Sequence, residues 1–265
     1  MGGAELVQIT TSGDRVRAAG DKSRFVKEIE EALLRGDVDL AVHSAKDVPA
    51  ELPDGLEIAS VPAREDPRDV LCGASSLDDL PQGARVGTAS VRRRSQLLAV
   101  RPDLEVVELR GNVDTRLRKL AEGGYDAIVL AAAGLARLGR SNEGTPLPLA
   151  QLTPAPGQGC LALEIRADDE ATRTQVERID DRAASACLQA ERECVVVLEA
   201  TCDTPVGVLA ECVDGDPRAL CLRTYAGAVD GSVWIRDEST DSADVVGAAV
   251  AERMLAAGAA AVLGR

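Results

Sequence analysis

The feature that most constrains this chain is a regular alternation of strand-like and helix-like segments from about residue 85 onward. The apolar runs "ARVGTA", "LEVVELR" and "YDAIVLAAAG" alternate with the periodic stretches "SVRRRSQLLAV" and "VDTRLRKLAEGG". Such an alternation predicts a mostly parallel sheet covered by helices. An earlier stretch, 23–44, has a similar order, because apolar residues at helical spacing end at Gly36 and "DLAVHS" follows as a strand. We therefore expect an α/β fold.

The composition limits the kind of core and the partners of this fold. Apolar residues make up 45% of the 265 residues but only four are aromatic, so the core must be built from Ala, Val and Leu. The formal net charge of −14 argues against nucleic acid or an anionic membrane as a general partner. The acidity would suit a salt-rich host, a hypothesis that equal folding stability with and without KCl would reject.

No targeting or cross-linking pattern is recognised in the sequence. The opening residues lack a basic segment followed by an apolar one, and no run is long enough to span a bilayer, so we expect a cytoplasmic protein. Seven cysteines without C-x-x-C spacing and one histidine, His43, predict neither a disulfide framework nor a metal site. We expect His43 to be a packed polar residue.

Positive charge is concentrated in residues 85–119, which hold nine basic and four acidic side chains. Three arginines, at 92–94, fall in the first turn of a predicted helix, where the macrodipole disfavours each cation by about a few tenths of a kcal/mol. A bound anion would explain them, because a helix N-terminus and arginine both bind carboxylates and phosphates. Three further arginines could reach the same strand-end crevice: Arg110, Arg116 and Arg137. A solvated basic face is the alternative.

A lysine and an aspartate, Lys46 and Asp47, stand side by side where the predicted strand ends, just before Pro49. A local ion pair in a turn and a catalytic pair are both consistent with this position. The residues alone leave the choice between them open.

The order of these pieces resembles the porphobilinogen deaminase (hydroxymethylbilane synthase) family. The patterns HS-x-KD-x-P and RGN-x-x-TRL are highly specific, and the similar stretches span nearly the whole chain. These stretches are "FVKEIEEALLRGDVDLAVHSAKDVPAELPDGL", "REDPRDVL", "VGTASVRRRSQLL", "LRGNVDTRLRKL", "YDAIVLAAAGLARLG", "TPAPGQGCLALE" and "CDTPVG".

The resemblance implies a transferase that joins four porphobilinogen units head to tail, loses ammonia each time and releases the linear tetrapyrrole hydroxymethylbilane. It also implies two α/β lobes of the type II periplasmic-binding-protein kind, followed by a small C-terminal α+β domain. The expected domains are 1–63 with 156–180, then 64–155, and 181–265. A dipyrromethane primer would be held by a thioether, and the protein would be a monomer without nucleic-acid, membrane or metal partners.

The site residues carried over by this resemblance begin with Asp47, which would be the catalytic carboxylate. A fixed negative group would stabilise the ring-nitrogen charge that develops when ammonia leaves. Cys202 would hold the cofactor, although a buried free thiol is the ordinary role of a cysteine. The other cofactor-binding positions are Lys46, Ser44, Thr88, Ser90, Arg92, Arg93, Arg110 and Arg116. The substrate-binding positions are Arg137, Lys22, Lys27 and Phe25, and the alternative for Phe25 is an ordinary core position.

One departure from the family bears on activity. The family's opening strand and helix, with a G-T-R-x-S-x-L-A motif, has no counterpart in the sequence, so we expect either an incomplete start or an inactive copy. The alternative function is therefore a truncated homologue that acts at most as a polycarboxylate-binding module. A nucleic-acid-binding protein using residues 85–119 is a further rival, which the overall acidity and scarce aromatics oppose.

Overall fold

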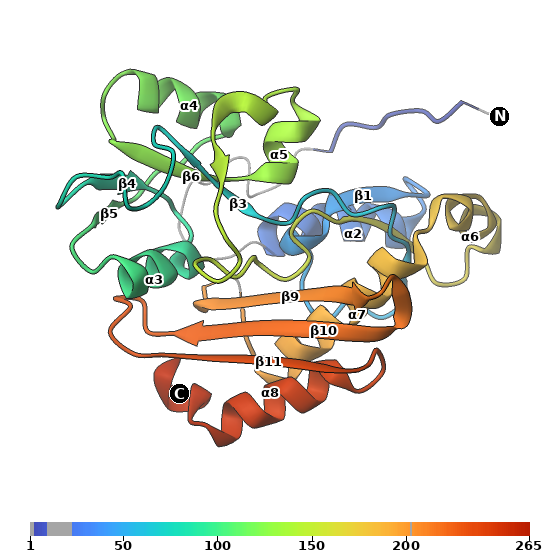
Figure 1. The fold of residues 1–265 in the computed structure, drawn as a ribbon. Coiled ribbons are helices and arrows are strands. Elements are labelled where there is room, and N and C mark those ends of the chain that lie inside the picture. Colours follow the sequence, from blue (N-terminus) through green and yellow to red (C-terminus); the bar gives the residue numbers. More distant parts are fainter. Residues whose placement is uncertain (1–2, 10–22, 202) are drawn as a thin grey trace.

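The structure is a computed structural model that describes residues 3–9, 23–201 and 203–265. In these ranges the strands form three sheets, and helices pack beside each of them (Figure 1). Each sheet with its helices is called a unit below. The described helices include none that is long and apolar enough to cross a membrane.

The first unit is a three-stranded sheet with the order β1-β8-β2. Its elements are α2 (Ser23–Arg35), β1 (Ala41–Ser44), β2 (Leu56–Ser60), β8 (Leu161–Arg166) and α6 (Glu170–Val176). Leu33 of α2 is fully buried against Ala41 and Leu56, which shows that the apolar face of the helix covers this sheet. The pairs are antiparallel, unlike those predicted for the middle of the chain, because β8 enters between β1 and β2 in the opposite direction.

The middle unit is a five-stranded sheet with the order β5-β4-β6-β3-β7. Its strands are β3 (Asp69–Cys72), β4 (Arg85–Gly87), β5 (Glu105–Val107), β6 (Ala127–Ala131) and β7 (Thr145–Pro146). Its helices are α3 (Val91–Val100), α4 (Val113–Ala121) and α5 (Ala132–Arg137). The predicted parallel pairing is confirmed for β5, β4 and β6, whereas β3 and β7 add antiparallel pairs. The last predicted strand stops at Ala131, where α5 begins.

The third unit is an antiparallel sheet, β11-β10-β9, packed against two helices. Its elements are α7 (Arg182–Val197), β9 (Val206–Val213), β10 (Asp216–Gly227), β11 (Trp234–Ser242), α8 (Val246–Ala256) and α9 (Ala259–Val262). Residues of α7, α8, β9 and β10 share one core. The last two helices, α8 and α9, are separated at Gly258, whose φ of +96° is a left-handed conformation that ends helices.

Two extended segments connect the first and middle units. The first crossover is residues 61–68, between β2 and β3, and the second is residues 147–160, between β7 and β8. The two run side by side, because the Glu65 amide donates to the Gly159 carbonyl oxygen at 3.2 Å. Short 3-10 turns complete the fold, at Ala45–Asp47, Ser141–Glu143 and Glu177–Ile179. The predicted α/β class with a C-terminal α+β unit is confirmed.

Candidate functional site

Lys46 and Asp47 lie in a tight turn that follows directly on β1. The turn is the 3-10 segment Ala45–Asp47, and the Val48 amide closes it by donating to the Ala45 carbonyl at 3.2 Å. The Ala45 amide donates to the Cys160 carbonyl at 3.1 Å, so the turn is fastened to the second crossover. The strand end and this crossover together fix where the lysine and the aspartate project.

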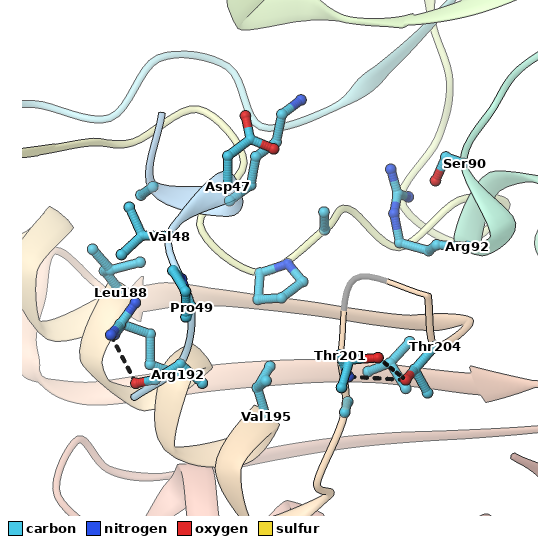
Figure 2. Close-up of a pocket in the computed structure, with 17 residues that line it drawn as sticks. Asp47, Val48, Pro49, Ser90, Arg92, Leu188, Arg192, Val195, Thr201 and Thr204 are labelled. Atoms are coloured by element: carbon cyan, nitrogen blue, oxygen red, sulfur yellow. Dashed lines mark hydrogen bonds between the residues drawn. The ribbon is translucent and has the colours of Figure 1, made fainter. Parts of the chain in front are cut away.

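The turn forms one wall of a pocket of about 290 Å³. The other walls come from the start of α3, the second crossover, one face of α7 and the loop before β9, so all three units contribute. Figure 2 shows Asp47 on one side of this pocket and Ser90 and Arg92 on the opposite side. Apolar side chains, among them those of Val48 and Leu188, also line the pocket. A pocket of this kind suits a small ligand with an apolar body and charged arms.

The loop before β9 closes the pocket with two threonines. The Thr201 amide donates to Thr204 Oγ1 at 2.8 Å, and the two hydroxyl oxygens are 3.1 Å apart (Figure 2). Both threonines line the pocket. The predicted cofactor cysteine, Cys202, lies outside the described residues, as do Lys22 and the side chain of Phe25.

Beside the pocket, Arg92 and Arg93 share a buried carboxylate. Arg92 Nη1 lies 2.7 Å from Asp69 Oδ2, Arg93 Nη2 lies 2.7 Å from Asp69 Oδ1, and Asp69 is fully buried. Burial by itself would raise the pKa of Asp69, but the charges of both arginines outweigh it and lower that pKa below its usual range. The sequence predicted a bound anion next to the three arginines. For Arg92 and Arg93 the protein itself provides an anion, the Asp69 carboxylate, which sequence reasoning missed. An acid at the start of an apolar strand was the available signal.

A glutamine connects this cluster to the turn of the first unit. Gln158 Nε2 donates to Asp69 Oδ1 at 3.0 Å and to the Pro67 carbonyl at 2.6 Å, while Gln158 Oε1 accepts from Lys46 Nζ at 3.5 Å. The side chain is 1% exposed. Hydrogen bonds therefore run from Lys46 through Gln158 to Asp69 and its two arginines.

The start of α3 holds two more predicted residues. Ser90 is the N-cap and accepts from the Arg93 amide at 3.4 Å, and Thr88 Oγ1 accepts from the Ser90 amide at 3.2 Å. Arg92 Nη1 also donates to the Thr153 carbonyl, and Arg92 Nε is buried without a hydrogen-bond partner among the described residues. Asp69 and the Thr153 carbonyl thus hold the guanidinium of Arg92 at this edge of the pocket.

The remaining predicted residues lie at varying distances from the pocket. Arg116 Nε donates to the Gly111 carbonyl at 2.8 Å, and burial, followed by the charge of Arg93, lowers the pKa of Arg116. Arg137 Nη2 donates to the Gly159 carbonyl of the second crossover at 2.7 Å. Arg110 pairs with Glu108 on the surface. Ser44 precedes the turn of Asp47 without a side-chain capping bond, and Lys27 is exposed on α2.

Sequence reasoning also missed residues of α7. Arg192 lines the pocket and donates to the Ala50 carbonyl at 2.7 Å, and burial lowers its pKa, an effect that Glu164 partly offsets (Figure 2). The preceding residue, Glu191, is fully buried, and Arg64 Nη1 donates to its Oε1 at 2.6 Å. Charged residues inside the apolar stretch "LQAERECVVV" were the signal. His43 is buried as expected, with Nε2 at 2.8 Å from Glu164 Oε2.

Comparison with known proteins gives matches over most of the chain. The family model described as "Porphobilinogen deaminase, dipyromethane cofactor binding domain" matches residues 2–174, and that described as "Porphobilinogen deaminase, C-terminal domain" matches 185–256. A porphobilinogen deaminase of Brevibacillus brevis is 47% identical over 98% of this chain and 86% of its own length. One of Roseiflexus sp. is 49% identical over 96% and 86%.

Solved structures give weaker matches. A periplasmic substrate-binding protein of an ABC transporter from Coxiella burnetii is 16% identical, with a TM-score of 0.39, over 59% of this chain and 77% of that chain. A likeness at this level supports no conclusion about a ligand. The fold class rests on the observed sheets and helices and on the family.

Proposed function

Because this chain belongs to the porphobilinogen deaminase family, we propose that it is a transferase that joins four porphobilinogen units head to tail and releases hydroxymethylbilane. One observation carries the proposal: Asp47 and Arg92, from different units, line one pocket, together with Thr201 and Thr204 of the third unit. The matches to both family domains favour this enzyme over the alternative, a module that only binds polycarboxylates.

Asp47 is the proposed catalytic residue. When ammonia leaves porphobilinogen, positive charge develops on the pyrrole ring, and a carboxylate held next to it stabilises that charge. The same oxygens can accept the pyrrole N–H and a proton during bond formation. The position of Asp47 is suited to this role because the turn is fastened at Cys160 and opens onto a largely apolar pocket, where charge interactions are strong.

The cationic side of the pocket is proposed to bind the acetate and propionate arms. Arginine forms two parallel hydrogen bonds with a carboxylate and stays charged at any working pH. Arg92 lines the pocket, and Arg93 and Arg116 add positive charge. We assign the same task to Lys46, Arg110 and Arg137, and neutral hydrogen bonds to Ser44, Thr88 and Ser90. Lys22, Lys27 and Phe25 are proposed to contact incoming substrate.

A dipyrromethane group fits the residues present at this site. The pocket combines apolar walls, a carboxylate that can accept pyrrole N–H bonds and cations that can hold acidic arms. We propose that Cys202 holds the group by a thioether, with Ser90, Arg92 and Lys46 around it. When bound, it supplies the pyrrole to which the first substrate unit is joined, while the protein orients both partners and excludes water.

The arrangement of the molecule is part of the same proposal. We infer three domains, formed by 1–63 with 156–180, by 64–155 and by 181–265. We also propose that the protein is a monomer and acts in the cytoplasm. The three sheets support this division, because each belongs to one of these ranges. Sedimentation of the purified protein would test the oligomeric state.

The Asp47→Ala substitution tests the function directly. We expect porphobilinogen consumption to fall by about 100-fold or more, because a preorganised charge next to the reacting ring is lost. Cofactor uptake, read from the mass of the intact protein, should persist, and Cys202→Ser should abolish it. The control is Asp54→Ala, which removes an exposed carboxylate of the same unit. Wild-type turnover in the Asp47 variant would refute the assigned role, and a wild-type chain without cofactor or turnover would support the binding module.

A further inference from the structure

Two thiols of the third unit are in contact. The structure describes six free cysteines, and among them Cys187 of α7 and Cys212 of β9 have sulfur atoms 3.9 Å apart. A disulfide needs a sulfur separation of about 2.05 Å and a matching backbone geometry. A disulfide therefore requires the sulfur atoms to approach by roughly 2 Å, through side-chain rotation and a small shift of the backbone.

The backbone around the two thiols is already fastened together. Glu191 lies one turn after Cys187 on α7, and its Oε1 accepts from the amide of Ala210, two residues before Cys212, at 2.8 Å. Cys187 belongs to the shared core of this unit, and Cys212 packs against that core. The helix and the strand are thus fastened to each other beside the two thiols.

The two sulfur atoms differ in their access to solvent. Cys187 is 5% exposed, whereas Cys212 is half-buried. Burial, and then the neighbouring Cys212, raises the pKa of the Cys187 thiol well above its usual range. A reagent from solution should therefore meet Cys212 first, and Cys187 should react afterwards with the sulfur beside it.

We propose that Cys187 and Cys212 are a redox modification site, at which a low-molecular-weight disulfide converts the two thiols into a reversible intramolecular disulfide. The Cys212 thiolate attacks the reagent, forms a mixed disulfide and releases one thiol. The Cys187 thiolate then attacks the Cys212 sulfur and releases the second thiol. The protein loses two electrons and two protons, and the reagent gains them as two thiols.

The cross-link would close a ring of residues 187–212. This ring contains the loop of Thr201 and Thr204 beside the pocket, and it joins the helix that carries Glu191 to the strand that follows the loop. Closing such a loop restricts the unfolded chain more than the folded one, so the oxidised protein should unfold at a higher temperature, by on the order of 5 °C. This inference is independent of the proposed catalytic function.

Peptide mapping tests the proposal on the full chain. The protein is incubated with oxidised glutathione, free thiols are blocked with N-ethylmaleimide, and the chain is cut with trypsin and a glutamate-specific protease without reduction. Each cysteine of the proposed pair then lies in a peptide with no other cysteine, 183–191 for Cys187 and 212–218 for Cys212. We expect these two peptides joined, at a mass two hydrogens below their sum, and separated again by dithiothreitol.

Three variants complete the test. Cys212→Ser should abolish the joined peptide and the rise in melting temperature, and Cys187→Ala should leave glutathione attached to Cys212. Cys221→Ser removes a partly exposed thiol of the same sheet and should leave both results unchanged. Glutathione that stays on Cys212 of the wild-type protein, Cys212 joined to another cysteine, or no reaction at all would each overturn the proposal. Melting of the reduced variants shows whether each one is folded.

Discussion

At the scale of single residues, two guanidinium groups next to the pocket share one buried carboxylate. Asp69 receives hydrogen bonds from Arg92, Arg93 and Gln158, so the arginines are held in place before any ligand arrives. The net charge of the three charged groups remains positive, which leaves attraction for a carboxylate ligand. Fixing a cation in this way lowers the cost of ordering it when the ligand binds.

The Asp69→Asn substitution should destabilise the fold strongly. It keeps the shape of the side chain but leaves two buried cations without their counter-charge, a change that costs about 3–5 kcal/mol in other proteins. Unfolding by urea measures the free energy. The control, Asp66→Asn, removes the partner of Arg68 near the surface, where the expected loss is only about 0.2–1 kcal/mol. Equal losses of unfolding free energy in the two variants would show that the buried Asp69 pairs stabilise the fold no more than the surface pair does.

The Asp69→Asn substitution should also change how the free energy of unfolding depends on pH. The pKa of Asp69 is lowered in the folded protein, so its charge contributes stability above the unfolded value of about 3.9, and that contribution is lost as the pH falls toward the folded pKa. The free energy of unfolding of the wild-type protein should therefore decrease more steeply than that of Asp69→Asn as the pH falls below about 4. Parallel pH profiles for the two proteins would contradict this.

At the scale of elements, the start of α3 and the two crossovers decide the geometry of the pocket. Three arginines in the first turn of a helix are unfavourable next to its dipole, and the structure relieves this locally. Arg92 and Arg93 bond Asp69, and Arg94 donates to the Val106 carbonyl of β5 at 2.7 Å. The arginine run thus has a structural role beside the proposed binding role.

The Gly159→Ala substitution tests the close approach of the crossovers. Gly159 has a φ of +93°, and a Cβ atom there would lie 2.3 Å from the carbonyl oxygen of Glu65. Both the left-handed backbone and the contact are unfavourable, so we expect a loss of roughly 2–4 kcal/mol in thermal or urea unfolding. Gly139→Ala is the matched control, because Gly139 also has a positive φ of +69° but open space around it. If the two glycine variants unfolded alike, the crossover contact would not matter.

At the scale of the whole molecule, the third unit is attached to the other two by apolar packing of α7 and by polar contacts. Ala184 and Leu188 of α7 share a buried cluster with Val48 and Cys160. Glu191 accepts from Arg64 of the first crossover and from the Gly157 amide of the second at 2.6 Å, as well as from Ala210 of its own sheet. Tyr225 Oη lies 2.7 Å from Ser95 Oγ of α3. These contacts fasten the third unit to the two crossovers and to α3.

The Glu191→Gln substitution should loosen this attachment. The neutral amide leaves the buried Arg64 without a counter-charge, and we expect a loss of about 3 kcal/mol or more of unfolding free energy. Amide exchange at Gly157 and Ala210 should accelerate, since both amides donate to the lost carboxylate. Glu252→Gln, on the exposed face of α8, is the control. Unchanged exchange at both amides would show that Glu191 does not join the units.

The sequence by itself determined the α/β alternation, the C-terminal α+β unit and the family, because periodicity and motifs are local properties of the chain. It also indicated Asp47 and the arginine run, since both stand at predicted element ends. Only the tertiary structure decided how the charges are paired. Asp69 with Arg92, Arg64 with Glu191, and Cys187 with Cys212 are each separated by more than twenty positions, so their contacts depend on how the sheets and crossovers pack.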